Sequence, residues 1–469
     1  MDLRITNTAS IISGDRVLTD HDIIVRDGTI TALEPSGSAG PGPTERVGPN
    51  RLNGDRGHTG ADGVRDGAGT DLPVRDERER VIDGSRFCAI PGFKNAHTHA
   101  AMTLLRGYGD DMRLQEWLQT RIWPAESALT GEDVYAGTRL AAIEMIASGT
   151  TFANDMYFFF PEAYRAFADS GIRAAVGLAL FDFGDADRRR QIQKEVDTLL
   201  DEYAGRGSDG SLVFPTIAPH GIYTCSGELL QWAAARSREF DLPFHIHMSE
   251  TEQEVDDCVA AHGLRPWRYL QRLGVLDEIA GRGIAAHGVW LDDDERSLIA
   301  EHRITLAHNP VSNMKLSSGA FDWAAVAERG IPVMLAPDGV ASNNNLDMFD
   351  EMKTAALLQK HHFREPTRLP ASEILAAATG GRSDLFRRWG VGGALEAGAP
   401  ADITLVSLDH PQLVPVHNIE SNLAYAANGT MVDTVICNGK ILMEGRRIPG
   451  ADEVMRAAAD RAQALVKRS

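Results

Sequence analysis

Between residues 91 and 341 the chain repeats one pattern, in which a short apolar run ends in polar residues and a helix-like stretch follows. Eight such runs occur, at residues 88–99, 149–157, 172–180, 212–221, 243–250, 283–291, 303–313 and 331–339. Near-continuous apolar runs are typical of strands buried on both faces, and their alternation with helices is typical of a parallel sheet. The pattern therefore predicts an α/β fold with a (β/α)8 TIM-type barrel over residues 91–395.

The two ends of the chain carry a different pattern. Residues 1–34 and 401–446 alternate apolar and polar positions like hairpin strands. We expect an N-terminal part, 1–90, and a C-terminal part, 396–448, to pair into one small composite β-sandwich, followed by a terminal helix within 449–469. Residues 35–70 are rich in Gly and Pro and poor in large apolar residues, which predicts a flexible insert because little surface can be buried to offset the ordering entropy.

Composition and charge narrow the class of protein. With 43% hydrophobic and 24% charged residues the chain has an ordinary globular composition. A net charge of −19 without a basic block argues against a nucleic-acid polymer as partner. No apolar run approaches the roughly 20 residues of a membrane span, and residues 1–10 do not resemble a signal peptide, so we expect no membrane partner and a cytoplasmic location. The four cysteines are widely separated and form no Cys-x-x-Cys, which is typical of reduced structural thiols.

Polar residues occupy the carboxyl ends of the predicted strands, where barrels of this type carry their chemistry. His97 and His99 close the first run and, as residues i and i+2 of a strand, point to the same side. The later strand ends contribute His220, His247, Glu250, His287 and Asp338. One His-x-His alone can be accidental, but several imidazoles and a carboxylate at neighbouring strand ends suit a divalent first-row metal with an open position for water. His245 shares the face of His247 but lies deeper, and we interpret it as a packed core residue.

Five segments carry a resemblance to a known family. They are PGFKNAHTHAAMTLLRGYGDD, HIHMSET, AAHGVWL, AHNPVSNMKLSSG and APDGVASNNNLDMFDEM. As an ordered set they resemble the amidohydrolase superfamily, and within it the 5′-methylthioadenosine/S-adenosylhomocysteine deaminases. The resemblance implies that the metal ligands are His97, His99, His247 and Asp338, and that the catalytic residues are Glu250, His287 and Asp338. Members with two metals generally bridge them with a modified lysine at the end of strand four, and the fourth run here contains no lysine.

The resemblance therefore implies one divalent metal, zinc before iron or manganese, and a hydrolytic deaminase that replaces the 6-amino group of an adenosine-type nucleoside by oxygen. Such an ion brings the pKa of its water from about 15.7 towards about 7. Asp338 and His287 are expected to orient that water and accept its proton. Glu250, three residues beyond a ligand, is placed to give a proton to a ring nitrogen of the base.

Four further residues are expected to contact the substrate. Glu126 resembles the family's ribose-binding glutamate, since a carboxylate can accept two hydrogen bonds from a diol, although it can also be a charge at a helix N-terminus. His220 resembles the substrate-contacting histidine of the family. Trp117 suits either stacking against the adenosine part or core packing. Ser342 suits either a contact to a purine nitrogen or a role in shaping its loop.

Other functions share parts of this pattern. A guanine deaminase or an s-triazine aminohydrolase or chlorohydrolase uses the same metal site on another ring, and Glu126 favours the sugar-bearing substrate. A catalytically silent scaffold is a different class, and the complete set of ligand and proton-transfer positions argues against it. Homo-oligomers are the commoner outcome among such relatives, so a homo-oligomer is possible, and the sequence leaves the oligomeric state open.

The substituent at the 5′ position of the nucleoside is the remaining question. Binding the carboxylate of S-adenosylhomocysteine calls for an arginine. The third run has none at its carboxyl end, and Arg188, Arg189 and Arg190 beyond it read as a solvated helix start. We therefore expect small or uncharged 5′ groups, as in 5′-methylthioadenosine or 5′-deoxyadenosine, to be preferred.

Overall fold

The computed structural model describes residues 2–37, 79–112 and 114–468. The flexible insert predicted at 35–70 therefore falls, from residue 38 onwards, outside the described residues. No helix in the part of the chain that the structure describes is both long and apolar enough to cross a membrane.

Eight parallel strands form the centre of the molecule, and each pairs with the next in chain order. They are β8 (Phe93–Thr98), β9 (Thr150–Tyr157), β10 (Arg173–Leu180), β11 (Val213–Pro219), β12 (Phe244–Met248), β13 (Gly283–His287), β14 (Thr305–His308) and β15 (Val333–Leu335). The loop after β15 returns to β8, because Asp338 N donates to His97 O at 3.2 Å and Thr98 Oγ1 donates to Asp338 O at 3.0 Å. The predicted (β/α)8 barrel is confirmed.

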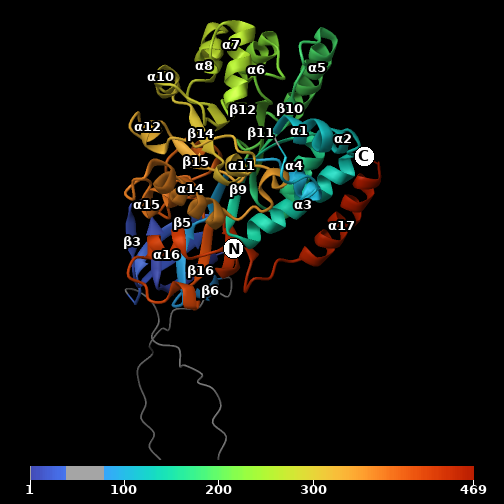
Figure 1. Cartoon of the computed structure of the whole chain (residues 1–469). Helices are drawn as coiled ribbons and strands as arrows, with labels where there is room; N and C mark the ends of the chain where they lie inside the picture. The colour runs from blue at the N-terminus through green and yellow to red at the C-terminus, as the bar shows by residue number, and fades with distance from the viewer. Residues whose placement is uncertain (1, 38–78, 113, 469) are drawn as a thin grey trace, which may run out of the picture.

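Helices connect these strands and surround them (Figure 1). The longer ones are α3 (Gly131–Ala147), α4 (Phe160–Ser170), α5 (Ala186–Tyr203), α6 (Gly227–Glu239), α7 (Glu252–His262), α10 (Asp293–Glu301), α14 (Met348–Phe363) and α15 (Ala371–Ala378). Short ones are α1 (Leu114–Trp117), α2 (Trp123–Ser127), α8 (Pro266–Arg272), α9 (Val275–Ile279), α11 (Pro310–Lys315), α12 (Trp323–Ala327), α13 (Val340–Asn343) and α16 (Ile419–Tyr425). Side-chain caps at Thr130, Ser226 and Asp292 start α3, α6 and α10, because each accepts a backbone N–H of the first turn.

Two further sheets lie beside the barrel, and the larger of them combines strands from both ends of the chain (Figure 1). The four-stranded sheet has the order β5 (Thr29–Pro35), β4 (His21–Arg26), β1 (Asp2–Thr8) and β6 (Glu79–Asp83). The six-stranded sheet has the order β18 (Lys440–Met443), β17 (Val432–Cys437), β16 (Ile403–Ser407), β7 (Phe87–Pro91), β2 (Ser10–Ser13) and β3 (Arg16–Leu18). Apolar residues of both sheets, such as Leu3, Ile23, Ala89 and Ile403, share one core. The two chain ends thus build one small sandwich beside the barrel.

The first apolar run is divided between the two parts, contrary to its interpretation as a single barrel strand. Cys88 to Pro91 lie in β7, which pairs antiparallel with β16, and the barrel strand begins only at Phe93. Gly92 lies between them, and a Cβ there would come within 2.2 Å of the Thr151 side chain. Only a glycine leaves room for the Thr151 side chain at this junction, where one continuous run passes from the sandwich to the barrel.

The helix α17 (Ala451–Arg468) follows the sandwich and packs along α3 on the outside of the barrel (Figure 1). Its Arg461 and Arg468 both reach Asp133, a fully buried carboxylate in the first turn of α3. The last helix therefore lies against the segment that follows the first barrel strand.

Candidate metal and active site

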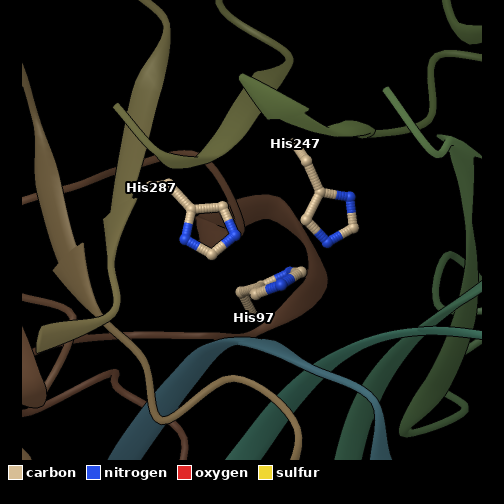
Figure 2. Close-up of side chains that lie close together, drawn as sticks. All are labelled: His97, His247 and His287. Carbon is tan, nitrogen blue, oxygen red and sulfur yellow. The ribbon is translucent and has the colours of Figure 1, made fainter. Parts of the chain in front are cut away.

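Four side chains from three strand ends meet at the carboxyl end of the barrel. They are His97 and His99 from β8 and the residue after it, His247 from β12, and Asp338 from the loop after β15. The Oδ1 atom of Asp338 lies 3.2 Å from His97 Nε2 and 3.4 Å from His99 Nε2. The Nε2 atoms of His99 and His247 are 3.3 Å apart. Figure 2 shows His97 and His247 turned toward each other, with His287 beside them.

The other ring nitrogen of each histidine has a fixed partner. The Nδ1 atoms of His99 and His247 lie 2.6 Å from the backbone carbonyl oxygens of Met156 and His220, respectively. Because a carbonyl oxygen can only accept, Nδ1 carries the hydrogen and the lone pair of Nε2 faces the common centre. His97 Nδ1 is 2.8 Å from His245 Nε2, while His97 Nε2 is buried without a hydrogen-bond partner among the described residues.

His97 and His247 at this centre are neutral and the carboxyl group of Asp338 is ionised, which are the forms that bind a metal ion. Burial lowers the pKa of His97 to about 4 and that of His247 well below its ordinary value, so both imidazoles are neutral. Burial alone raises the pKa of Asp338, but the neighbouring His97, His287 and His99 outweigh this and hold the pKa well below the usual range. Three imidazole nitrogens and one ionised carboxylate fit a divalent ion, and the buried, unpartnered Nε2 of His97 is explained by such an ion. One ring nitrogen of His287 also lies within 4.8 Å of a ring nitrogen of His97 and of His247.

Glu250 and His287 lie next to these ligands. Glu250 Oε2 is 3.7 Å from His287 Nε2, and Glu250 Oε1 accepts a hydrogen bond from Ser318 at 3.1 Å. Burial raises the pKa of Glu250, although His287 opposes the shift. His287 Nδ1 lies 2.9 Å from the amide oxygen of Asn313, so Nδ1 carries the hydrogen and Nε2 is directed toward Glu250. Burial opposes protonation of His287, but Glu250 and Asp338 raise its pKa.

The backbone that carries Glu250 is held by a second buried carboxylate. Glu254 accepts the backbone N–H of Ser249 at 2.7 Å and that of Glu250 at 2.8 Å. The Ser249 carbonyl in turn accepts the N–H groups of Val289 and Trp290, both at 2.9 Å. The ends of β12 and β13 are therefore tied together where Glu250 and His287 meet.

A cavity of about 460 Å³ opens above this centre. Its wall contains all four residues expected to contact substrate, which are Trp117, Glu126, His220 and Ser342. Burial raises the pKa of Glu126 to about 7, partly offset by Tyr157. Nearby aromatic rings make much of the lining apolar, as a cavity that takes a heterocyclic base requires.

Two of the predicted substrate residues are also engaged within the protein. Ser342 Oγ lies 2.9 Å from Ser312 Oγ and 3.4 Å from Asp338 Oδ2, and Ser312 Oγ donates to Asp338 Oδ2 at 2.7 Å. Ser342 thus belongs to a hydroxyl pair that orients Asp338, as well as to the cavity wall. Trp117 is only 5% exposed, so it packs in the core and also borders the cavity.

The three arginines lie at the start of α5, as predicted, and Arg188 and Arg190 are exposed, but Arg188 also borders the cavity. Asp185 caps α5, Arg189 pairs with Asp182 at 3.1 Å, and Arg190 pairs with Asp187. The Arg188 side chain instead borders the cavity, where its guanidinium lies over two aromatic rings. The rings are Phe181, 4.6 Å away, and Phe183, 5.1 Å away, and cation–π attraction holds the side chain there.

Several residues of the site were not singled out from the sequence. Ser312 and Asn313 lie inside one of the quoted segments, so a signal for them was present. Glu254 lies in the first turn of α7, four positions after Glu250 in the sequence. Tyr157 closes the second apolar run, and its position at a strand end was the available signal.

Comparison with known protein families gives one match that covers most of the chain. The family described as Amidohydrolase family matches residues 88–442. This range includes the whole barrel and the C-terminal strands of the sandwich up to β18.

Similar proteins of known name agree with this match. A protein of Methanospirillum hungatei named 5′-deoxyadenosine deaminase is 47% identical over 402 residues, which cover 84% of this chain and 87% of its own. A protein of Archaeoglobus fulgidus named 5-methylthioadenosine/S-adenosylhomocysteine deaminase 1 is 45% identical over 391 residues, covering 83% of this chain and 90% of its own. Among solved structures, an adenosine deaminase from Xanthomonas campestris with bound zinc superposes with a TM-score of 0.84 at 32% identity over 99% of both chains.

Proposed function

Since the chain belongs to the amidohydrolase family, we propose that it is a metal-dependent hydrolytic deaminase of adenosine-type nucleosides. Water supplies the oxygen that bonds to C6 of the base, the bond from C6 to the amino nitrogen breaks, and ammonia leaves. The observation that carries the proposal is the convergence of three imidazole nitrogens and Asp338 at the base of a cavity whose wall also carries Glu250 and Glu126. The relatives named as deaminases of 5′-deoxyadenosine and related nucleosides support it.

The residues proposed to hold the metal are His97, His99, His247 and Asp338. One divalent ion, zinc in our proposal, suits three nitrogen donors and one oxygen donor with a position left open. When bound, it acts as a Lewis acid that makes water nucleophilic at neutral pH. The strand end after β11 carries His220 and no lysine, which supports a single ion.

The proton transfers are assigned to Glu250, His287 and Asp338. Because His287 Nδ1 faces the Asn313 amide oxygen, the neutral imidazole carries its lone pair on Nε2, and the raised pKa of His287 suits a group that accepts a proton from the attacking water. Asp338, held by Ser312, orients that water through its carboxylate. Glu250 has a raised pKa because it is buried, and so can hold a proton that it gives to a ring nitrogen of the base.

The substrate is assigned from the cavity wall. Glu126 is placed to accept hydrogen bonds from the ribose hydroxyls, and Trp117 and His220 to contact the base and the sugar. We propose that uncharged 5′ groups are preferred, because Phe158, Phe181 and Phe183 make the wall beside Arg188 aromatic. The guanidinium of Arg188 is the group that a charged 5′ substituent would meet there.

We also propose that the protein resides in the cytoplasm. All four cysteines are buried and free, which supports a reducing compartment such as the cytoplasm.

A substrate screen tests the proposed function. Purified enzyme is assayed for ammonia release from adenosine, 5′-deoxyadenosine, 5′-methylthioadenosine, S-adenosylhomocysteine, guanine and cytosine, with metal content measured in parallel. We expect about one equivalent of divalent metal, deamination of the adenosine compounds, and higher kcat/KM for 5′-deoxyadenosine than for S-adenosylhomocysteine. His97→Ala is expected to abolish both metal binding and turnover. Activity on guanine alone, or a protein without bound metal and without activity, would refute the proposal.

The same assay decides the 5′ preference. Arg188→Ala is expected to reduce kcat/KM for S-adenosylhomocysteine while leaving 5′-deoxyadenosine nearly unchanged. If S-adenosylhomocysteine is the better substrate of the wild-type enzyme and loses that advantage in Arg188→Ala, the preference is reversed.

A further inference from the structure

One phenol in the cavity wall lies beside Glu126 and makes no hydrogen bond of good geometry within the described residues. Tyr157 is the last residue of β9 and borders the cavity, although its side chain is only 3% exposed. Its hydroxyl oxygen is buried and has no hydrogen-bond partner among the described residues. An unsatisfied buried hydroxyl costs free energy comparable to a lost hydrogen bond, so its persistence at a cavity wall points to a ligand group that satisfies it.

The strand end that carries Tyr157 is held firmly. Asp155 Oδ1 accepts the backbone N–H of Ala100 at 2.7 Å, and the Met156 carbonyl accepts a hydrogen bond from His99 at 2.6 Å. The ring of Tyr157 also packs on Phe158, with ring centroids 5.0 Å apart. The phenol therefore presents its hydroxyl from a fixed position.

The neighbour of this hydroxyl is Glu126. Its carboxylate raises the pKa of Tyr157 further above the value that burial produces, and Tyr157 in turn lowers the pKa of Glu126. The phenol is consequently protonated at every physiological pH and acts as a hydrogen-bond donor. No cation forms an ion pair with Glu126 in the part of the chain that the structure describes. Its carboxylate is therefore left to accept hydrogen bonds from uncharged donors such as hydroxyl groups.

We propose that Tyr157 and Glu126 together bind the ribose diol, and that Tyr157 is a specificity-determining residue. The diol hydroxyls donate to the Glu126 carboxylate, and the Tyr157 hydroxyl donates to the oxygen of one of them. The Tyr157 hydroxyl then has a hydrogen bond of good geometry, which it lacks within the described residues, and a chain of hydrogen bonds of this kind is mutually strengthening. The inference rests on the proposed function and adds a residue that selects 2′- and 3′-hydroxylated nucleosides.

The test compares Tyr157→Phe with the wild-type enzyme on adenosine, 2′-deoxyadenosine, 3′-deoxyadenosine and 2′,3′-dideoxyadenosine. We expect kcat/KM for adenosine to fall roughly 3- to 10-fold, as for one neutral hydrogen bond, with the change in KM rather than in kcat. For 2′,3′-dideoxyadenosine we expect little change, so the ratio of the two kcat/KM values falls by the same factor. The monodeoxy compound that behaves like the dideoxy compound identifies the hydroxyl that Tyr157 contacts.

Two controls separate substrate binding from a structural role. Tyr223→Phe removes another phenol from the same cavity wall and is expected to leave the ratio between adenosine and dideoxyadenosine unchanged. Because the buried Tyr157 hydroxyl makes no hydrogen bond of good geometry within the described residues, Tyr157→Phe is expected to keep its metal and to leave Tm unchanged or slightly higher. A Tm lowered by several degrees, or an equal loss on all four substrates, would show that the phenol supports the fold or His99 and would overturn the proposal.

The inference and the proposed function fail in different ways. A wild-type enzyme that deaminates none of the four nucleosides would refute the function itself. A wild-type enzyme that deaminates adenosine, with a Tyr157→Phe variant that retains the same preference for the diol, would refute only the role of Tyr157.

Discussion

Glu250 is held by contacts that leave its carboxyl group available in the cavity. Its backbone N–H is bound by Glu254, one of its oxygens accepts from Ser318, and the other faces His287. None of these contacts requires that Glu250 bind the metal. Its role as proton donor can therefore be separated from the metal site by substitution.

Glu250→Gln keeps the shape of the side chain and removes its acidic proton. We expect kcat/KM to fall by about 10² to 10⁴, the range typical of a general acid or base, with metal content unchanged. Steady-state kinetics and metal analysis of the same preparation provide the measurement. Glu252→Gln is the matched control, since this exposed residue of α7 lies two positions away. Retained activity together with lost metal would assign Glu250 to the support of the ligands.

Protonation of Glu126 is expected to make the KM for the substrate depend on pH. Because burial raises its pKa to about 7, the carboxylate form disappears as the pH falls through neutrality. The protonated group accepts fewer hydrogen bonds from a diol, so KM for adenosine is expected to rise as the pH drops below about 7. A KM profile over pH 5.5–9 is the measurement, and Glu126→Gln is expected to raise KM and to flatten the profile. The KM for 2′,3′-dideoxyadenosine serves as the control, and a parallel rise for it would contradict this assignment.

Residues at strand ends were predictable from the sequence, whereas their partners were not. The order of apolar runs placed His97, His247 and His287 at one end of the barrel. The interactions between His97 and His245 and between His287 and Asn313 join positions 148 and 26 residues apart. Such pairs depend on the packing of whole elements, and no local spacing indicates them.

At the scale of elements, three of the strands that carry site residues end in left-handed backbone. Ser249 after β12, His287 at the end of β13 and Asp338 after β15 have positive φ angles of 52°, 75° and 66°. Left-handed backbone is costly for residues with side chains and tends to persist at functional sites, where surrounding contacts hold it. Here the Glu254 carboxylate and the cross-loop hydrogen bonds hold it. The apolar pattern predicted the strands, but it contains no information on these turns.

The contact between α17 and α3 leads to a prediction at the same scale. Asp133 is fully buried, and Arg468 Nη2 lies 2.5 Å from its Oδ2. Arg468→Ala is expected to lower the free energy of unfolding by about 1–3 kcal/mol, because a buried carboxylate loses a charged donor. It is also expected to raise KM more than it lowers kcat, since Asp133 starts the helix that follows α2 and Glu126.

Urea unfolding and steady-state kinetics measure the two effects of the α17 substitution. Arg456→Ala on the exposed side of the same helix is the control and is expected to change neither. A fall in kcat with an unchanged KM would contradict the argument, because it would connect α17 with the metal centre instead of with Glu126.

At the scale of the whole molecule, a buried ion network joins the sandwich to the barrel. Asp402, which precedes β16, lies 3.5 Å from Lys94 of β8 and 3.3 Å from Arg173 of β10. All three side chains are nearly inaccessible to solvent. Asn438 N also donates to Asp402 at 2.7 Å, so the network reaches the turn between β17 and β18. The C-terminal part of the sandwich is thereby fixed to the starts of two barrel strands, β8 and β10.

This network shows the limit of prediction at the largest scale. The rhythm of the apolar runs predicted the barrel, and the alternating ends predicted a composite sandwich. Lys94 lies within a segment that matched a family pattern, and Asp402 begins an alternating run, so each had a local explanation. Their pairing follows only from the way in which the sandwich is seated on the barrel.

Asp402→Asn keeps the shape of the side chain and leaves Lys94 and Arg173 buried without an anion. Breaking a buried ion pair by removing one partner typically costs about 3–5 kcal/mol, and we expect a decrease of that order in the free energy of unfolding. Asp409→Asn is the matched control, because it removes a carboxylate from an exposed pair with Arg86 and is expected to cost far less. Urea unfolding of the metal-loaded proteins is the measurement. The folded Asp402→Asn enzyme is expected to retain its metal and its kcat/KM, since Lys94 and Arg173 lie at the starts of their strands and His97 at the other end. Loss of metal without loss of stability would show instead that the network sets the geometry of the ligands.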